Sequence, residues 1–338
     1  MKLLSVVVPC FNSAQYMSRA IETLLSGGDK MEIIIVNDGS SDDTLNIANR
    51  YKEMYPDIIK VVDQENKGHG GAVNSGLEIA TGLYFRVVDS DDWVREESLL
   101  LLIRSIELMY KKDDLADVII TNFVYEKAGR TNKKVMKYNN VFESFKMHSW
   151  NEAKKFRQGQ YILMHSTTYN TELLKNINLK LPEHTFYVDN LFVFIPLAQV
   201  EKIYYIDTNL YRYYIGRDDQ SVNEEVMCKR IDQQIKVNKL MIEALDISKI
   251  QSKEQRRYLI LYLATIQVVT SVLLNKIGTD DAIKKKKDLW EYLFAKQPTV
   301  YKFMSTNLLG RIAKSNTKIG IKLSEVGYKI TQKIYGFN

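Results

Sequence analysis

The chain has 338 residues, with 47 lysine and arginine residues against 41 aspartate and glutamate residues, which gives a formal net charge of +6. At about 100–200 residues per domain, this length predicts two domains, or one large domain with an appendage. Residues 311–333 hold six basic side chains and one acidic side chain, and so carry +5 of that charge. The remainder is therefore close to neutral, which gives no support to nucleic-acid binding.

The cysteine and histidine content argues against a disulfide framework or a cysteine-ligated zinc site. The two cysteines are far apart, and the four histidines lack metal-ligand spacing, so we interpret the histidines as structural or hydrogen-bonding residues. The apolar run after Lys2 stops at Pro9, too early for a signal peptide, and we expect a cytoplasmic protein. Residues 258–274 are uncharged, but their polar side chains favour a buried helix over a membrane span: Thr265, Gln267, Thr270 and Ser271.

The first hundred residues alternate apolar runs with helical segments. Strands are predicted at residues 5–8, 32–36, 58–62 and 84–88. Helices are predicted from an N-cap at Ser13 to residue 25, from Asp42 or Asp43 to before Pro56, and from the glycine-rich turn 67–71 to Ala80. Continuous apolar strands separated by helices predict an α/β fold with a parallel sheet covered on both faces, and ligands bind at the carboxyl ends of such strands.

The later part of the chain gives a more mixed pattern. Strands are predicted at residues 118–124 and 203–206, and a helix at 187–197. From Asn223 onward the pattern is helical, which predicts a C-terminal helical region over residues 223–338.

An acidic cluster follows the fourth predicted strand, in the order Asp89, Ser90, Asp91, Asp92. Carboxylates two residues apart at a strand end can turn toward one ion, and hard divalent cations prefer such oxygen ligands. The alternative is that these acids cap the helix beginning near Glu96.

Two further segments follow strand ends. Residues 37–41, Asn-Asp-Gly-Ser-Ser, place Asp38 where a carboxylate can accept from a base N–H or a ribose hydroxyl, although the same residues suit a plain turn. In residues 66–76, glycines let the backbone approach a ligand and Lys67 can meet a diphosphate. This second segment matches neither a P-loop nor the dinucleotide-binding pattern.

Taken in order, these motifs resemble the family 2 glycosyltransferases of the GT-A fold. The resemblance rests on Val-Val-Val-Pro-Cys-Phe-Asn at 6–12, Ile-Ile-Val-Asn-Asp-Gly-Ser-Ser-Asp-Asp-Thr at 34–44, the 66–76 segment and Val-Asp-Ser-Asp-Asp-Trp at 88–93. It is strong over residues 1–100, weaker to 222 and absent beyond. It implies a GT-A domain over residues 1–222, with a nucleotide-sugar half (1–100) and an acceptor half (101–222).

The resemblance also implies residue roles. It places Asp91 as the ligand of Mg²⁺ or Mn²⁺, and it places a set of donor-binding residues around the nucleotide and its sugar: Pro9, Phe11, Asn12, Asp38, Asn66, Lys67, Asn74, Asp89 and Ser90. One position departs from the pattern, because many members carry arginine where this chain has Val73. His69 and Lys67 are the candidates to compensate for it.

The general base of the family is an acid at the start of a helix in the second half, and Asp189 aligns with it. Val188 stands where a glutamate is expected, Glu183 is an alternative base, and Asp189 is otherwise a plain helix N-terminal acid. Residues 211–221 resemble the loop that covers the donor diphosphate, with Arg217 able to pair with phosphate oxygens, or else a strand and turn with solvated charges.

The resemblance therefore implies an inverting hexosyl- or N-acetylhexosaminyltransferase that moves sugar from a UDP-sugar to a carbohydrate or lipid-linked glycan, in bacterial polysaccharide or cell-wall glycan synthesis. A nucleotide-sugar-binding scaffold and a nucleotidyltransferase are the alternatives. The last helix pairs an apolar stripe with lysines, so residues 311–334 are expected either to contact the inner face of the cell membrane or to pack on their own domain.

Overall fold

The computed structural model describes residues 1–127, 133–157, 159–216, 223–317 and 320–322. The chain divides into two compact units, each described by itself. The sheet unit consists of Met1–Lys155 and Ile162–Tyr214, and the helical unit consists of Phe156–Tyr161 and Ile215–Asn338. The domain boundary expected at residue 222 lies outside the described residues.

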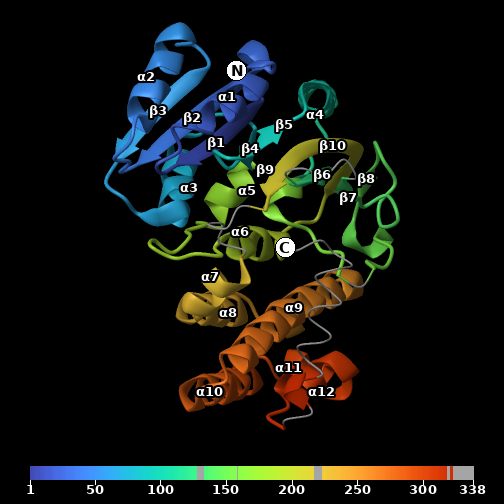
Figure 1. The fold of residues 1–338 in the computed structure, drawn as a ribbon. Helices are drawn as coiled ribbons and strands as arrows, with labels where there is room; N and C mark the ends of the chain where they lie inside the picture. Colours follow the sequence, from blue (N-terminus) through green and yellow to red (C-terminus); the bar gives the residue numbers. More distant parts are fainter. Residues whose placement is uncertain (128–132, 158, 217–222, 318–319, 323–338) are drawn as a thin grey trace. The chain divides into compact units, whose positions relative to one another are not determined.

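The sheet unit begins with a parallel arrangement, as the alternation of apolar runs and helices predicts (Figure 1). In β1 and β2 every residue is buried, and Val6 pairs with Ile33 while Val7 pairs with Val87 across the parallel ladders. The α3 helix packs on β1 and β2, and α2 packs on β3. The bounds are β1 Leu4–Cys10, α1 Met17–Leu25, β2 Met31–Asp38, α2 Thr44–Met54, β3 Ile59–Gln64, α3 Gly68–Ile79 and β4 Tyr84–Val87.

Two details of this half differ from the sequence-based expectation. The predicted N-cap at Ser13 is wrong: α1 begins at Met17, and the Ser13 carbonyl accepts the backbone N–H groups of Tyr16 and Met17 at 2.9 and 3.0 Å, closing a turn before the helix. The glycine-rich segment does not precede α3 but forms its first turn, which starts at Gly68 with φ +74°.

The rest of the sheet unit adds antiparallel strands, giving a ten-stranded mixed sheet. Eight strands follow the order β3-β2-β1-β4-β9-β6-β10-β5, and the other two lie off this path, β7 paired with β6 and β8 paired with β10. The β9 strand pairs antiparallel with both β4 and β6, and β10 pairs antiparallel with β5. The bounds are β5 Trp93–Val94, α4 Glu96–Lys111, β6 Val118–Lys127, β7 Lys134–Met136, β8 Met147–His148, β9 Thr167–Asn170, α5 Thr171–Asn176, α6 Asp189–Leu197 and β10 Ile203–Ile215.

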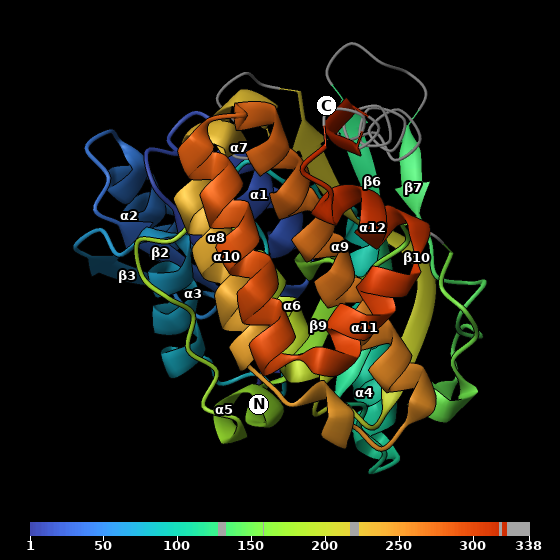
Figure 2. The same cartoon turned by 90° about the horizontal axis from the view of Figure 1, so that it is seen from below.

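The helical unit is built around α9, against which α8 and α10 pack (Figures 1 and 2). The α9 helix is long and apolar enough to cross a membrane by length and composition, but 72% of its most apolar window is buried inside the structure, as a core helix would be. The bounds are α7 Glu224–Lys229, α8 Ile231–Glu243, α9 Lys253–Ile277, α10 Asp280–Lys296, α11 Pro298–Thr306 and α12 Leu308–Lys314.

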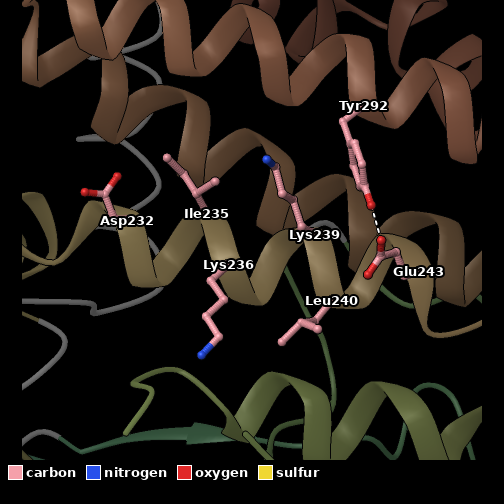
Figure 3. Close-up of a pocket in the computed structure, with 7 residues that line it drawn as sticks. All are labelled: Asp232, Ile235, Lys236, Lys239, Leu240, Glu243 and Tyr292. Carbon is pink, nitrogen blue, oxygen red and sulfur yellow. Dashed lines mark hydrogen bonds between the residues drawn. The ribbon is translucent and has the colours of Figure 1, made fainter.

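The surface of the helical unit carries a groove of about 330 Å³ between α8 and α10 (Figure 3). Its charged side chains are paired at the surface: the Tyr292 hydroxyl bonds to Glu243, and Lys239 lies 5.2 Å from the Tyr292 ring. Of the predicted basic C-terminal helix, Lys314 packs within this unit, 4.6 Å from the Tyr301 ring. Residues 318–319 and 323–334 of that prediction lie outside the described residues.

Candidate active site

The loops after β1 and β2 are tied together at the carboxyl edge of the sheet. Asn12 has φ 49°, and its side-chain oxygen accepts the backbone N–H of Ser41 at 2.9 Å. Pro9 is buried in β1, whereas Phe11 projects with 54% of its surface exposed. An exposed phenylalanine costs free energy in water, so this ring is available to stack on a planar ligand.

Asp38 joins the loops after β2 and β3. One of its carboxylate oxygens accepts the backbone N–H of Lys67 at 2.8 Å and the side-chain amide of Gln64 at 2.7 Å. The Asn66 amide donates to the Asp38 carbonyl at 2.9 Å. A Cβ on Gly39 would lie 2.7 Å from the Asn66 backbone nitrogen, so this close approach requires glycine.

The acidic cluster after β4 is held on both sides. Asp89 Oδ1 lies 2.8 Å from His69 Nε2 in the first turn of α3, and Ser90 shares a hydrogen bond with Ser13 at 2.8 Å. Asp92 is almost fully buried and accepts hydrogen bonds from the Tyr211 hydroxyl at 2.5 Å and the Tyr214 backbone N–H at 2.7 Å. The β10 strand therefore closes over the cluster.

The charges of this cluster shift its pKa values. Burial raises the pKa of Asp92 well above its usual value, and the negative charges of Asp91 and Asp89 raise it further. Burial alone would raise the pKa of Asp89, but the hydrogen bond and charge of His69 outweigh it, so the pKa of Asp89 is lowered. Burial would lower the pKa of His69, yet its pKa is raised because the Asp89 contact dominates. Such opposed shifts within one cluster are typical of functional sites.

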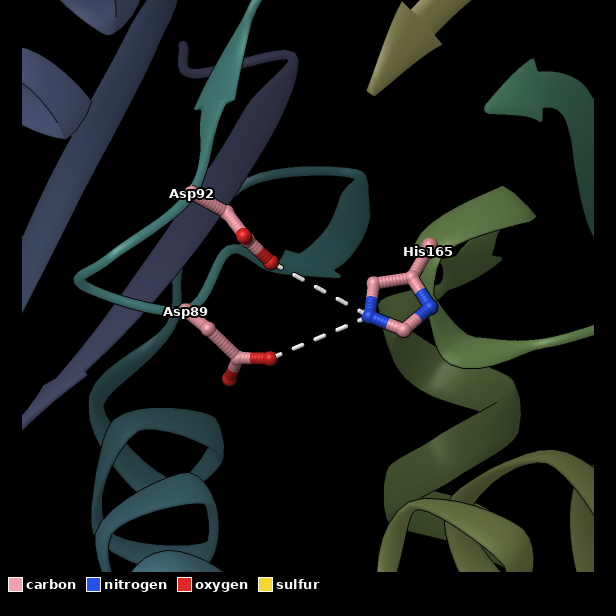
Figure 4. A group of neighbouring side chains, drawn as sticks. All are labelled: Asp89, Asp92 and His165. Atoms are coloured by element: carbon pink, nitrogen blue, oxygen red, sulfur yellow. Dashed lines mark ion pairs between the residues drawn. The ribbon is translucent and has the colours of Figure 1, made fainter. Parts of the chain in front are cut away.

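A residue not singled out from the sequence also reaches the cluster. Nε2 of His165 lies 4.0 Å from both Asp89 Oδ2 and Asp92 Oδ2 (Figure 4). Burial lowers the pKa of His165 to about 4, so the ring is neutral at neutral pH. Donor atoms of these three residues lie within 4.8 Å of one another, and two carboxylates with a neutral imidazole fit a divalent metal ion. Asp91, the ligand predicted from the sequence, is half-buried beside this group.

Asp189 begins α6, and its side chain is half-buried. Burial raises its pKa to about 6; the charge of Asp89 raises it too, while His69 opposes the shift. A carboxyl group with a pKa near 6 is matched to proton transfer at neutral pH. Val188 is buried before it as the N-cap, and Glu183 is exposed.

The segment that leads to Asp189 is fastened to α3. The backbone N–H of His184 donates to the Lys67 carbonyl at 2.7 Å. Both ends of the Asn74 side-chain amide bond to the backbone of Leu181, at 2.8 and 2.9 Å. Asn74 therefore links α3 to the segment that precedes Asp189. Arg217 lies outside the described residues.

Known proteins share this fold. The structure of Staphylococcus aureus TarS 1–349 in complex with UDP-GlcNAc aligns with a TM-score of 0.70 at 20% identity, over 97% of this chain and 92% of that one. This likeness shows the fold, which is that of the GT-A glycosyltransferases, with a helical C-terminal region. Residues 5–171 match the sequence model of glycosyl transferase family 2, and the domain that they form belongs to this family.

Bacterial relatives carry glycosyltransferase and cell-wall names. Glycosyltransferase GlyG of Streptococcus pneumoniae is 38% identical over 124 residues, which are 36% of this chain and 39% of that protein. The minor teichoic acid biosynthesis protein GgaB of Bacillus subtilis is 29% identical over 226 residues, 64% of this chain and 23% of that protein. The matches span between 31% and 39% of the length of the first curated relatives.

Proposed function

We propose that this chain is an inverting glycosyltransferase that moves a hexosyl or N-acetylhexosaminyl group from a UDP-sugar to a hydroxyl group of a carbohydrate or lipid-linked glycan. The observation that carries the proposal is Asp189. Its carboxyl group, with a pKa of about 6, stands at the start of a helix and feels the charges of Asp89 and His69. A base of this pKa is ionised at neutral pH and still able to accept a proton.

The chain's residues divide the work. Phe11 stacks on the uracil, and the loops joined by Asp38 and Asn12 surround the base and ribose. The acceptor oxygen bonds to the anomeric carbon from the side opposite the leaving group while its proton passes to Asp189. The bond between that carbon and the UDP oxygen breaks, and UDP leaves with the electron pair. Carboxylates of the acidic cluster would hold a divalent ion, which would neutralise the charge of the diphosphate.

The relatives suggest where to look for the substrates. TarS was solved with UDP-GlcNAc, and GgaB is named for teichoic acid biosynthesis, so UDP-GlcNAc is the first donor to test and cell-wall or capsular glycans are the first acceptors. We place the reaction in bacterial polysaccharide or cell-wall glycan assembly, at the cytoplasmic face of the membrane.

A UDP-release assay tests this function. Purified full-length protein with Mn²⁺ is screened against UDP-sugars, then against glycan acceptors with the best donor. We expect UDP release that an acceptor accelerates, together with a product one sugar larger by mass spectrometry. Binding of the UDP-sugar without acceptor-stimulated release would instead indicate a binding scaffold. Release of pyrophosphate from UTP and a sugar 1-phosphate, in a parallel assay, would indicate a nucleotidyltransferase; either result overturns the proposal.

A further inference from the structure

His165 is a buried histidine whose ring nitrogens make no recorded hydrogen bond in the described part of the chain. Its side chain is 7% exposed. Nδ1 has no hydrogen-bond partner in the described part of the chain. The recorded polar neighbours of Nε2 there are the Asp89 and Asp92 oxygens at 4.0 Å, which is too long for a hydrogen bond. The fold therefore supplies no hydrogen-bond partner for Nε2, the ring nitrogen that faces the two carboxylates.

The ring is nevertheless held in one orientation. It stacks on Tyr213 with centroids 4.2 Å apart and an interplanar angle of 25°, and the Tyr211 ring meets it edge-on at 4.6 Å. The His165 carbonyl accepts a hydrogen bond from the buried guanidinium group of Arg86, which also donates to Thr168 Oγ1 at 2.8 Å. Packing and backbone together therefore aim Nε2 between the two carboxylates (Figure 4).

The spacing fits a shared ion. Nitrogen and oxygen ligands lie about 2.0–2.2 Å from divalent transition metals, so two ligands of one ion are separated by up to about 4.3 Å. The 4.0 Å separations from Nε2 to each carboxylate oxygen fall inside that limit. A cation there would also stabilise the ionised form of Asp92, whose recorded hydrogen-bond donors, Tyr211 and Tyr214, are neutral.

We propose that His165 is a nitrogen ligand of a divalent transition-metal ion that Asp89 and Asp92 hold with it. This inference rests on the proposed function, because it specifies the metal site of that glycosyltransferase. Imidazole nitrogen suits transition metals, whereas Mg²⁺ is bound by oxygen ligands. The site therefore prefers a transition-metal ion over Mg²⁺. A site made of Asp91 and phosphate oxygens alone would not have this preference.

Pulsed electron paramagnetic resonance of Mn²⁺ tests the ligand directly. Full-length protein is loaded with Mn²⁺, with and without UDP, and the nitrogen hyperfine coupling is recorded in unlabelled protein and in protein with ¹⁵N-labelled histidine. We expect a histidine nitrogen coupling that disappears in His165→Phe, a variant that keeps the ring stack on Tyr213. His69→Phe is the matched variant, because His69 also touches Asp89, and it keeps the coupling.

Equilibrium binding supplies the second readout. His165→Phe is expected to weaken Mn²⁺ binding by about tenfold or more and to leave Mg²⁺ binding unchanged. The proposal is overturned if bound Mn²⁺ shows no histidine coupling in the wild type, or if the coupling vanishes in His69→Phe and survives in His165→Phe. The isotope comparison needs no variant, so poor folding of His165→Phe does not block the test. None of these measurements uses turnover, so failure of the UDP-release assay is a separate result.

Discussion

Both units bury neutral polar side chains that bond to one another, but the sheet unit also holds a cluster of ionisable groups. In the helical unit Asn238 donates to Gln267 at 3.0 Å and to Thr270 at 3.2 Å, while Asn238 Oδ1 and Gln267 Nε2 have no partner in the described part of the chain. In the sheet unit Tyr205 donates to Asn122 at 2.8 Å, and carboxylates and a histidine gather near the end of β4 with pKa values displaced in both directions.

The difference separates polar groups that serve the fold from those that serve a site. Neutral hydrogen-bonded pairs cost little to bury and fix how helices pack. Neighbouring buried carboxylates cost stability, and such an arrangement persists where a bound ligand or ion makes use of it. Lys286 is the exception in the helical unit, a buried cation whose Nζ donates to Asn275 at 2.6 Å and to the Ser315 carbonyl at 2.8 Å.

The largest effect that the comparison predicts is on turnover. Asp189→Asn removes the proton acceptor but keeps the side-chain shape, so we expect kcat to fall by about 10²–10⁴-fold. Because the variant also removes a partly buried charge, Tm should stay the same or rise. Rates come from UDP release at saturating donor, with Glu183→Gln, the exposed alternative base, as the matched control that keeps its rate. A fall in Tm with rate retained would place Asp189 among the residues that serve the fold.

The pH profile gives an independent reading of the same residue. With a pKa of about 6, Asp189 is a carboxylate above that pH and a neutral acid below it. The acceptor-dependent rate should therefore drop about tenfold per pH unit below pH 6 and level off above it. Asp189→Asn should remove this fall in rate below pH 6. If the variant still shows the fall, the titration belongs to another group.

The next effect in size is on stability, at Lys286. Burial lowers its pKa from 10.5 to about 8 in the folded protein. Between pH 8 and 10.5 the unfolded chain therefore binds more protons, so the free energy of unfolding rises with pH, by about 3 kcal/mol in total. Lys286→Met removes this rise and should leave turnover unchanged.

Denaturant unfolding of wild type and variant at pH 8 and 10.5 measures the difference, which cancels other titrations. Lys285→Met is the control, because its ammonium group is at the surface and pairs with Asp232 at 2.7 Å and Asp281 at 3.0 Å. If the free energy of unfolding changes with pH in the same way in all three proteins, burial does not lower the pKa of Lys286.

The parallel half of the fold follows from sequence because its signals are local. Each strand is a continuous apolar run, and residues such as Gly39 and Gly82 mark where it ends or begins. The antiparallel half depends on contacts between distant segments, such as β9 with β4 and β6, which periodicity does not encode. The N-cap prediction at Ser13 failed because serine suits turns as well as helix caps.

The site shows the same limit. Asp38, Asp89 and Asp189 belong to recognisable motifs, so their roles are predictions that the sequence alone supports. His165 lies in no such motif, and its approach to Asp89 and Asp92 arises from the fold of Met164–Ser166 against Arg86. The one available signal was chemical: it is one of only four histidines in the chain.

The smallest predicted effect concerns His69, whose ring contacts Asp89. Its contact with Asp89 at 2.8 Å orients a donor-side carboxylate, and a hydrogen bond between charged groups contributes about 1.5–3 kcal/mol. His69→Ala should therefore raise KM for the UDP-sugar by about tenfold or more with a smaller change in kcat. Loss of kcat with KM unchanged would mean that His69 acts in the chemical step or in the fold and not in donor binding.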